Sequence, residues 1–425
     1  MRLGSCLKNE NRRSLIRLKF LGETKGGSGF PDNEQGLLNE ELPFFKVKDL
    51  AQDKSEKYLY KTNNSISCNT AKKLRAFVFQ KNSIVFAKVG AALLLHRFKL
   101  LGQPSCIDNN MMGFMVKNDI LDHRYAMYAF SLFNFEDIVN PGAVPSLNEE
   151  QINNQTIPIA PIEEQRQIAD FLDHETTCLD SLIDEKNNLL NLLAEKRLTI
   201  IESIVTRGIN PKVKLKDFGI SWLKDMPEHW EHRRVAYLFS ERDERSQPDL
   251  PLLVVSINTG VTLRKFSDDR IENMAADASS YKVARKGDIS FNKMRMWQGA
   301  VGVSPTDGLV SPDYVVAEPT APMDVEYFGL LFKTQIFSAE TARHSHGITW
   351  DRLRLYWEDF RDIRVPLPPV EEQTAIVEAV KEQTAKLDAL KEATELTIAL
   401  LRERRSALIA AAVTGKIEIG VHYAS

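Results

Sequence analysis

The sequence predicts an α+β protein with a pseudo-twofold internal repeat. Two globular domains are expected to be separated by two long helices that pair and form a coiled-coil spacer. Three observations lead to this prediction: a nine-residue motif occurs twice, a seven-residue apolar spacing follows each copy, and the segments before the two copies share shorter matches. Self-similarity of this kind defines an architecture before any single motif is considered.

The repeated motif is the strongest of these signals. Ile157–Gln165 (IPIAPIEEQ) recurs as Val365–Gln373 (VPLPPVEEQ), so that each residue of the second copy lies 208 positions after its counterpart. The correspondence continues without a gap, and Arg197 meets Arg405 far down the chain. Coincidence does not explain a match of this length.

Each copy of the motif opens a segment that is typical of a long helix. Pro161 and Pro369 precede an acidic Glu-Glu-Gln turn, which suits a helix amino terminus, and Gly208 and Gly415 mark the far ends. Each helix of roughly 40 residues is on the order of 60 Å long and needs a partner for its apolar seam. We expect the two helices to pair with each other; the alternative is that each packs only on its own globular domain. The seven-residue series are Leu172, Leu179, Lys186, Leu193 and Ile200, and then Val380, Leu387, Thr394, Leu401 and Leu408.

The predicted boundaries are 1–156 for the first domain, 157–209 for the first helix, 210–364 for the second domain, and 365–425 for the second helix and tail. The two domain sequences also match each other: Lys81–Lys88 corresponds to Lys286–Lys293 at an offset of 205, and Leu42–Phe45 to Leu250–Leu253 at an offset of 208. Short apolar runs predict strands at 76–79, 84–87, 252–257 and 314–317. Helices are expected at 124–133 and 325–337.

Composition limits the class of protein. Of the 425 residues, 43% are apolar and four are cysteines, at Cys6, Cys68, Cys106 and Cys178, without a Cys-x-x-Cys pair. This pattern argues against a disulfide framework and a zinc ribbon, and no signal peptide or membrane span is recognised, so we expect a cytoplasmic protein. The net charge is −3, but the two helical segments hold 19 acidic and 12 basic residues while the rest holds 39 and 43. The positive charge therefore lies in the domains, which permits contact with phosphate.

Enzyme sites are not recognised. The chain has no Gly-Lys-Ser or Gly-Lys-Thr phosphate loop, and the turn at 140–143 (NPGA) lacks the aromatic residue of a methyltransferase site. His344 and His346 could bind a metal but are better interpreted as loop histidines that contact phosphate or solvent. Asp313 and Glu318 flank a predicted strand as nuclease carboxylates do, yet Thr320 stands where a nuclease would have lysine. We assign no catalytic residue, no metal site and no cofactor.

The residues resemble the specificity (S) subunits of Type I restriction-modification systems over nearly the whole chain. The resemblance is carried by four segments of the second half, with Lys25–Phe30 (KGGSGF) similar to a Gly-rich turn of such domains. The first half lacks the Pro-x-x-Trp opening. The four segments are Pro227–Trp230 (PEHW), Lys286–Arg295 (KGDISFNKMR), Gly308–Tyr314 (GLVSPDY) and Pro366–Gln373 (PLPPVEEQ).

The resemblance implies a function. The two domains would be target-recognition domains that read a bipartite DNA target, and the two long antiparallel helices would set the gap between its halves. Two methyltransferase (M) subunits that carry S-adenosylmethionine, and a restriction (R) subunit that translocates DNA with ATP and magnesium, would be the partners. The chain itself would be non-catalytic and would not bind a membrane. The alternatives are a coiled-coil scaffold that joins two protein-interaction domains, and an enzyme fragment.

Polar residues near strand ends and glycines are the candidates for DNA contact, because phosphate contacts position a protein and a few side chains read bases. The first domain offers Lys25, Lys88, Asn109 and Asn110. The second offers Lys293, Arg295, Gln298, Arg343, His344, Arg352 and Arg354.

Overall fold

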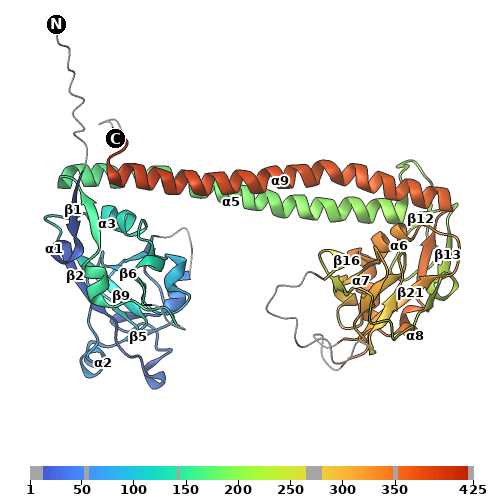
Figure 1. The fold of residues 1–425 in the computed structure, drawn as a ribbon, viewed down its shortest axis with the longest axis horizontal. Coiled ribbons are helices and arrows are strands. Elements are labelled where there is room, and N and C mark those ends of the chain that lie inside the picture. The colour runs from blue at the N-terminus through green and yellow to red at the C-terminus, as the bar shows by residue number, and fades with distance from the viewer. Residues whose placement is uncertain (1–12, 52–56, 141–143, 265–279, 348–352, 420–425) are drawn as a thin grey trace, which may run out of the picture. The chain divides into compact units, whose positions relative to one another are not determined.

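The chain divides into two compact units, and the boundaries between them fall inside the two long helical segments of the repeat (Figure 1). The computed structural model describes residues 13–51, 57–140, 144–264, 280–347 and 353–419. Unit 1 comprises residues 1–187 and 396–425, and unit 2 comprises residues 188–395. Both boundaries, 187/188 and 395/396, occupy the same place in the repeat. Each unit therefore contains one globular domain, the first half of its own helix, and the last half of the other helix.

The two long helices are α5 (Ile162–Arg207, 46 residues) and α9 (Val370–Thr414, 45 residues). Gly208 and Gly415 follow them, each with φ +76°, a left-handed conformation that glycine adopts without strain. Within unit 1, Nε of Arg405 on α9 lies 2.9 Å from Oδ1 of Asp180 on α5, and within unit 2 Arg197 makes the equivalent contact with Asp388 at 3.0 Å. The helices run antiparallel in both units, as the family resemblance implies.

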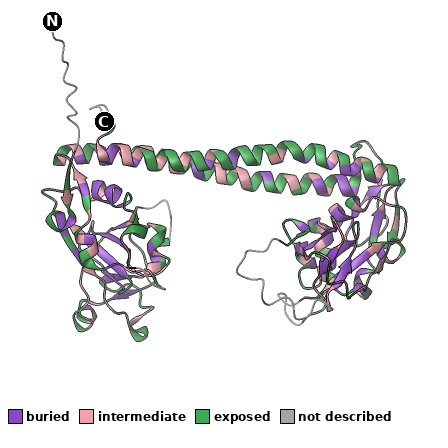
Figure 2. Ribbon diagram, viewed as in Figure 1, coloured by how far each residue is buried: buried purple, intermediate pink, exposed green. Residues whose placement is uncertain are grey.

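The seam between the helices uses two interleaved series of positions, of which the sequence pattern identified one. Leu172, Leu179 and Leu193 of the predicted series are buried in α5, whereas Lys186 and Ile200 are only half-buried. The second series lies four residues further on and begins with Thr176 and Ile183 in α5. Its members in α9 include Thr384, Ile398 and Ala412, all buried. Figure 2 shows buried residues recurring along both helices while other faces stay exposed.

Domain 1 is built on a five-stranded sheet. Its strand order is β2 (Gly22–Gly26), β9 (Met111–Val116), β6 (Ile84–Ala87), β7 (Lys99–Leu101) and β4 (Tyr58–Leu59). Beside it are the sheet β5 (Ser65–Ile66), β3 (Leu42–Phe45), β8 (Cys106–Ile107) and the pair β1 (Ser14–Arg17), β10 (Thr156–Ile159). The helical segments are α1 (Leu18–Leu21), η1 (Asp32–Glu34), η2 (Val47–Ala51), α2 (Cys68–Lys73), η3 (Leu93–Leu95), α3 (His123–Phe130), η4 (Phe135–Asp137) and α4 (Glu149–Asn153).

The strand predicted at 76–79 is wrong. Only Phe79 forms a bridge, with Ser105, and the rest of the segment has no strand partner. The apolar run is there to supply the core: the ring of Phe79 is fully buried and occupies the space above Gly113, where an added Cβ would lie 2.3 Å from it. Burial, and not strand pairing, explains the hydrophobicity of this segment.

Domain 2 has a four-stranded sheet of order β14 (Phe239–Glu241), β21 (Tyr314–Pro319), β18 (Ile289–Asn292) and β19 (Val301–Val303). Its strand pairs are β17 (Lys282–Ala284) with β20 (Gly308–Val310), β15 (Leu253–Ser256) with β16 (Gly260–Leu263), β13 (Glu231–Arg234) with β22 (Arg364–Leu367), and β11 (Leu215–Lys216) with β12 (Met226–Pro227). The helical segments are η5 (Val235–Tyr237), η8 (Met296–Gln298), α6 (Val325–Phe332), α7 (Gln335–Arg343) and α8 (Trp357–Phe360).

The single helix predicted at 325–337 is in fact two helices. Thr334 has an extended backbone, and its side chain accepts a hydrogen bond from the N–H of Phe337, so it caps α7 and ends α6. The apolar periodicity continues through the break because both helices face the same core.

A buried tyrosine of each domain contacts the last turns of the long helix that follows the other domain. The hydroxyl of Tyr327 donates to the carbonyl of Val205 (3.0 Å) in unit 2, and that of Tyr125 lies 3.1 Å from the carbonyl of Val413 in unit 1. Val205 and Val413 occupy the same repeat position. Burial raises the pKa of Tyr125 to about 12, because the ionised phenol would lose its hydration.

The amino-terminal turns of the helices are fastened in the same repeated way. Gln165 and Gln373 are fully buried. The side-chain oxygen of Gln165 accepts a hydrogen bond from the backbone N–H of Asp122, the residue before α3, and that of Gln373 accepts one from Asp324, the residue before α6 (2.9 Å each). The core of unit 1 also includes Ile409 from the other helix. The alternative that each helix packs only on its own domain is therefore excluded.

Candidate nucleic-acid interface

The four candidate residues of domain 1 come together at one end of the five-stranded sheet. Lys25 lies near the end of β2, and Lys88 directly follows β6. Asn109 and Asn110 form the exposed turn before β9, and the carbonyl of Asn110 accepts from the N–H of Lys88 (2.9 Å). Because β2, β9 and β6 are neighbours in the sheet, these side chains share one edge.

The glycine-rich turn is what allows the strands to meet at this edge. A Cβ added at Gly27 would lie 2.0 Å from the carbonyl oxygen of Asp108, so no side chain fits there. A Cβ at Gly26 would lie 3.1 Å from Nζ of Lys88. Lys25 is partly neutralised by Glu23, whose Oε1 lies 3.1 Å from its Nζ.

In domain 2, three candidates follow β18, the strand that corresponds to β6. Lys293 lies over the ring of Tyr356, with Nζ 5.8 Å from its centre, and accepts from the N–H of Leu355 through its carbonyl (2.9 Å). Arg295 and Gln298 are exposed around the short turn η8. Gly299 ends this turn with φ +83° and lets the chain enter β19.

Of the remaining candidates of domain 2, the two at the end of α7 lie near this turn, since α7 packs against η8. Arg343 and His344 end α7, and both contact the buried carboxylate of Glu340, at 3.4 Å and 3.3 Å. Arg354 exchanges backbone hydrogen bonds with His346 (2.9 Å each) and precedes Leu355. Arg352 lies outside the described residues.

Glu318, one of the two carboxylates considered as nuclease residues, has structural partners. Glu318 pairs with Arg242 (2.5 Å) and accepts from the hydroxyl of Ser240 (2.9 Å). Arg242 also pairs with Asp288 (2.7 Å), whose pKa is raised by burial. His346 contacts Asp359 (3.1 Å), and nowhere in the described ranges do three potential metal ligands gather.

Sequence reasoning missed one set of basic residues. Two cavities, each between a domain and a long helix, are lined by basic residues. These are Lys57, Arg97 and Arg405 in unit 1, and Arg197, the repeat match of Arg405, and Lys333 in unit 2. The match of Arg197 to Arg405 was visible in the repeat, but both were assigned only to the helices. Their proximity to the domains depends on helix pairing across the repeat.

Comparison with known proteins agrees with this architecture. Residues 15–192 match the family described as the Type I restriction modification DNA specificity domain. The chain is 27% identical over 133 residues to the Type I restriction enzyme MjaVIII specificity subunit of Methanocaldococcus jannaschii; this match covers 31% of the chain and 30% of that relative.

Solved structures share the fold over almost the full length. A chain from a structure of the type I R-M system, solved to explain its complex assembly and conformational transition, superposes with a TM-score of 0.63 at 15% identity. It covers 96% of this chain and 98% of its own. The HsdS subunit from Thermoanaerobacter tengcongensis gives a TM-score of 0.52 at 16% identity, covering 97% and 99%. Residues 15–192 are thus similar to the Type I restriction modification DNA specificity domain, and the chain as a whole shares the fold of these solved structures.

Proposed function

We propose that this chain is the DNA sequence-specificity subunit of a Type I restriction-modification complex, and that it reads a bipartite target without performing chemistry itself. The observation that carries the proposal is the duplication of the candidate interface. Lys88 and Lys293 directly follow equivalent strands, β6 and β18, and each begins a loop that also contains an arginine, Arg97 and Arg295. Two such surfaces fastened to one helix pair suit two half-sites separated by a gap of fixed length.

Within each half-site, we propose that Lys25, Lys88, Asn109 and Asn110 contact DNA in domain 1. In domain 2 the same role falls to Lys293, Arg295, Gln298, Arg343, His344, Arg352 and Arg354. Arg295 and Gln298 are the best candidates for base contact, since they are exposed at a turn and carry the fork-shaped or amide groups that pair with base edges. Arg343 shares its charge with Glu340, which favours a positioning role.

Partner subunits would supply methylation and cleavage in the cytoplasm, where the genome lies. Leu182 and Leu390, and also Leu192 and Leu400, are repeat-matched leucines on α5 and α9 with 38% to 61% of their surface exposed. A duplicated apolar surface supports binding of two M subunits, with the R subunit joining the assembly. Replacing Leu182 and Leu390 by Gln should release the M subunit from a co-purified complex and leave DNA binding by the chain unchanged.

The experiment that tests the function has two stages. A genome-wide map of methylated motifs in the host should reveal one bipartite motif that disappears when the gene for this chain is deleted. A duplex carrying that motif should then bind the full chain more tightly than a scrambled duplex in a gel shift, with an affinity that falls as salt rises. A coiled-coil scaffold that only joins proteins would give no salt-dependent shift.

The role of Arg295 is tested with the same duplexes. Arg295→Ala should weaken binding to the mapped target by about 1–3 kcal/mol and relax one base position if Arg295 reads a base. An equal loss on the scrambled duplex would assign Arg295 to phosphate instead.

A further inference from the structure

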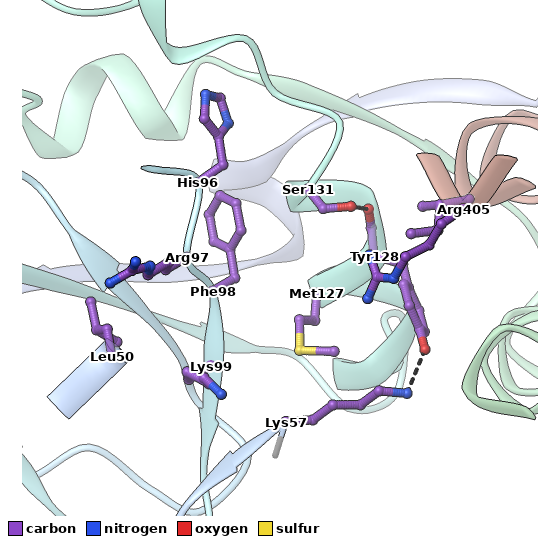
Figure 3. Close-up of a pocket in the computed structure, with 11 residues that line it drawn as sticks. Leu50, Lys57, His96, Arg97, Phe98, Lys99, Met127, Tyr128, Ser131 and Arg405 are labelled. Carbon is purple, nitrogen blue, oxygen red and sulfur yellow. Dashed lines mark hydrogen bonds between the residues drawn. The ribbon is translucent and has the colours of Figure 1, made fainter. Parts of the chain in front are cut away.

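Each unit contains a cavity at the same place in the repeat. Cavity 1, of about 300 Å³, lies in unit 1 between the β6–β7 connection, α3, and the last part of α9, which contributes Arg405 (Figure 3). Cavity 2, of about 1140 Å³, lies in unit 2 between the β18–β19 connection, α6 and α7, and the last part of α5, which contributes Arg197. A strand connection, a domain helix and the end of a long helix therefore line both cavities, and the arginine from the long helix is the same repeat position. Leu50 and Lys57 also line cavity 1, and the turn between β15 and β16 also lines cavity 2.

Both cavities are lined by cations, and no carboxylate is among the described residues that line them. Figure 3 shows Arg97 and Arg405 on opposite sides of cavity 1, with Lys99 and Lys57 between them. Cavity 2 is lined by Arg197, Lys333 and Arg343, together with neutral donors such as Gln298 and Ser338.

Several of these cations are already balanced by carboxylates from outside the cavities. Asp173 binds Lys57 (2.5 Å) and Asp180 binds Arg405. Asp388 binds Arg197 in unit 2. These ion pairs hold the cations in position but leave little net charge on them. The net charge of each cavity therefore depends on the other basic residues that line it.

Arg97 and Lys333 are the members that stay uncompensated. Arg97 is half-buried and forms no ion pair within the described ranges. Nζ of Lys333 reaches the carbonyl of Asn258 at 3.5 Å and no carboxylate of the described chain. Burial, and then the nearby Arg197, lower the pKa of Lys333, which means that an anion beside it would relieve an unfavourable charge.

We propose that each cavity receives a phosphate group of the DNA backbone, held by Arg97 in unit 1 and by Lys333 in unit 2. This inference rests on the proposed function and adds Arg97 and Lys333, as phosphate contacts, to the candidate DNA contacts named there. A phosphate recurs with each half-site of a duplex, which explains why the cavity is duplicated. Arg and Lys are the side chains that bind phosphate most strongly.

DNA is favoured over an acidic segment of a partner protein by what surrounds the cavities. The loop that lines cavity 1 begins at Lys88, a candidate DNA contact, and cavity 2 is lined by Gln298 and Arg343, two further candidates. A DNA backbone bound at these candidates would therefore lie beside elements that also line the cavities.

The test measures the salt dependence of DNA binding by the full chain. Arg97→Gln with Lys333→Gln is compared with the wild type by fluorescence anisotropy, on a duplex of random sequence and on the mapped target, between about 50 and 200 mM salt. Losing two phosphate contacts should reduce the slope of log K against log salt by about 1.8, at about 0.9 per phosphate. The loss should be equal on both duplexes, leaving the preference for the target unchanged.

Two control proteins separate this role from a general effect of charge or folding. Lys73→Gln with Lys386→Gln removes the same charge from exposed sites, one in each unit, and should keep the wild-type slope. Arg97→Lys with Lys333→Arg keeps both cations and should restore it. Circular dichroism melts show whether each variant folds.

Three outcomes overturn the proposal. One is a wild-type slope in the Arg97→Gln, Lys333→Gln variant. Another is stabilisation of the wild type by inorganic phosphate, lost in that variant while its DNA slope is unchanged, which would assign the cavities to a free anion. The third is loss of a co-purified methyltransferase with DNA binding intact, which would assign them to a partner's carboxylates. A wild type that does not prefer the mapped target would instead refute the proposed function.

Discussion

Lengthening both long helices by one heptad should lengthen the gap in the DNA target. α5 and α9 run without a break through the boundaries between the two units, at 187/188 and 395/396. These boundaries are repeat-equivalent, so duplicating residues 181–187 and 389–395 inserts seven residues at matching points. A seven-residue insertion preserves the alternating four- and three-residue steps of the seam.

The size of the effect follows from helix geometry. Seven residues add about 10.5 Å at 1.5 Å per residue, which corresponds to about three base pairs at 3.4 Å each. The insertion turns a helix by only about 20° relative to its seam, whereas three base pairs turn the duplex by roughly 100°. We therefore expect a gap three base pairs longer, with both half-sites unchanged and methylation less complete because the duplex must twist.

The assay is the methylated-motif map of a host that carries only the lengthened chain. An unchanged gap, or a change in either half-site, would refute the reasoning that the helices measure the gap. Inserting the heptad into α5 alone serves as the control: the roughly two extra turns have no partner on α9, so stability should fall without a new gap appearing.

Three further predictions concern stability. Gln373→Ala should destabilise the chain by about 2–4 kcal/mol in chemical denaturation, because two buried backbone groups lose their partner, whereas the exposed Gln383→Ala should change it by less than about 0.5 kcal/mol. A double-mutant cycle on Asp180 and Arg405 should give a coupling of only about 0.2–1 kcal/mol that shrinks with salt, since both side chains are about a third exposed; a salt-independent coupling of several kcal/mol would contradict this. The free energy of unfolding should decline as pH rises above about 10 toward 12, because the folded state keeps the proton of Tyr125 while the unfolded chain loses it. Tyr125→Phe should make this decline shallower. An identical pH profile in the variant and the wild type would reject the explanation.

The candidate interface shows how far a sequence reaches. Lys88 and Lys293 were identifiable because they end matching segments of the repeat, and the structure puts both directly after the central strands β6 and β18. Arg97 and Lys333 gave no such signal, since an isolated basic residue in a sequence resembles any solvated surface residue. The proposed role of these two residues depends on cavities that a loop, a domain helix and a distant segment of a long helix form only in the folded chain.

The sequence by itself determined the duplication and the two long helices, and it predicted that they pair, because a repeated apolar seam can be buried by a partner that carries the same seam. Their antiparallel direction was implied by the family resemblance, and the pairs of Asp180 with Arg405 and of Asp388 with Arg197 show it within each unit. The sequence also determined where the helices end, since Gly208 and Gly415 adopt the left-handed conformation that other residues avoid. Tertiary structure alone decided that each domain is completed by the far end of the other helix, as the contacts of Tyr125 with Val413 and of Tyr327 with Val205 show. Such contacts join residues more than a hundred positions apart, and local periodicity carries no information about distances in space between them.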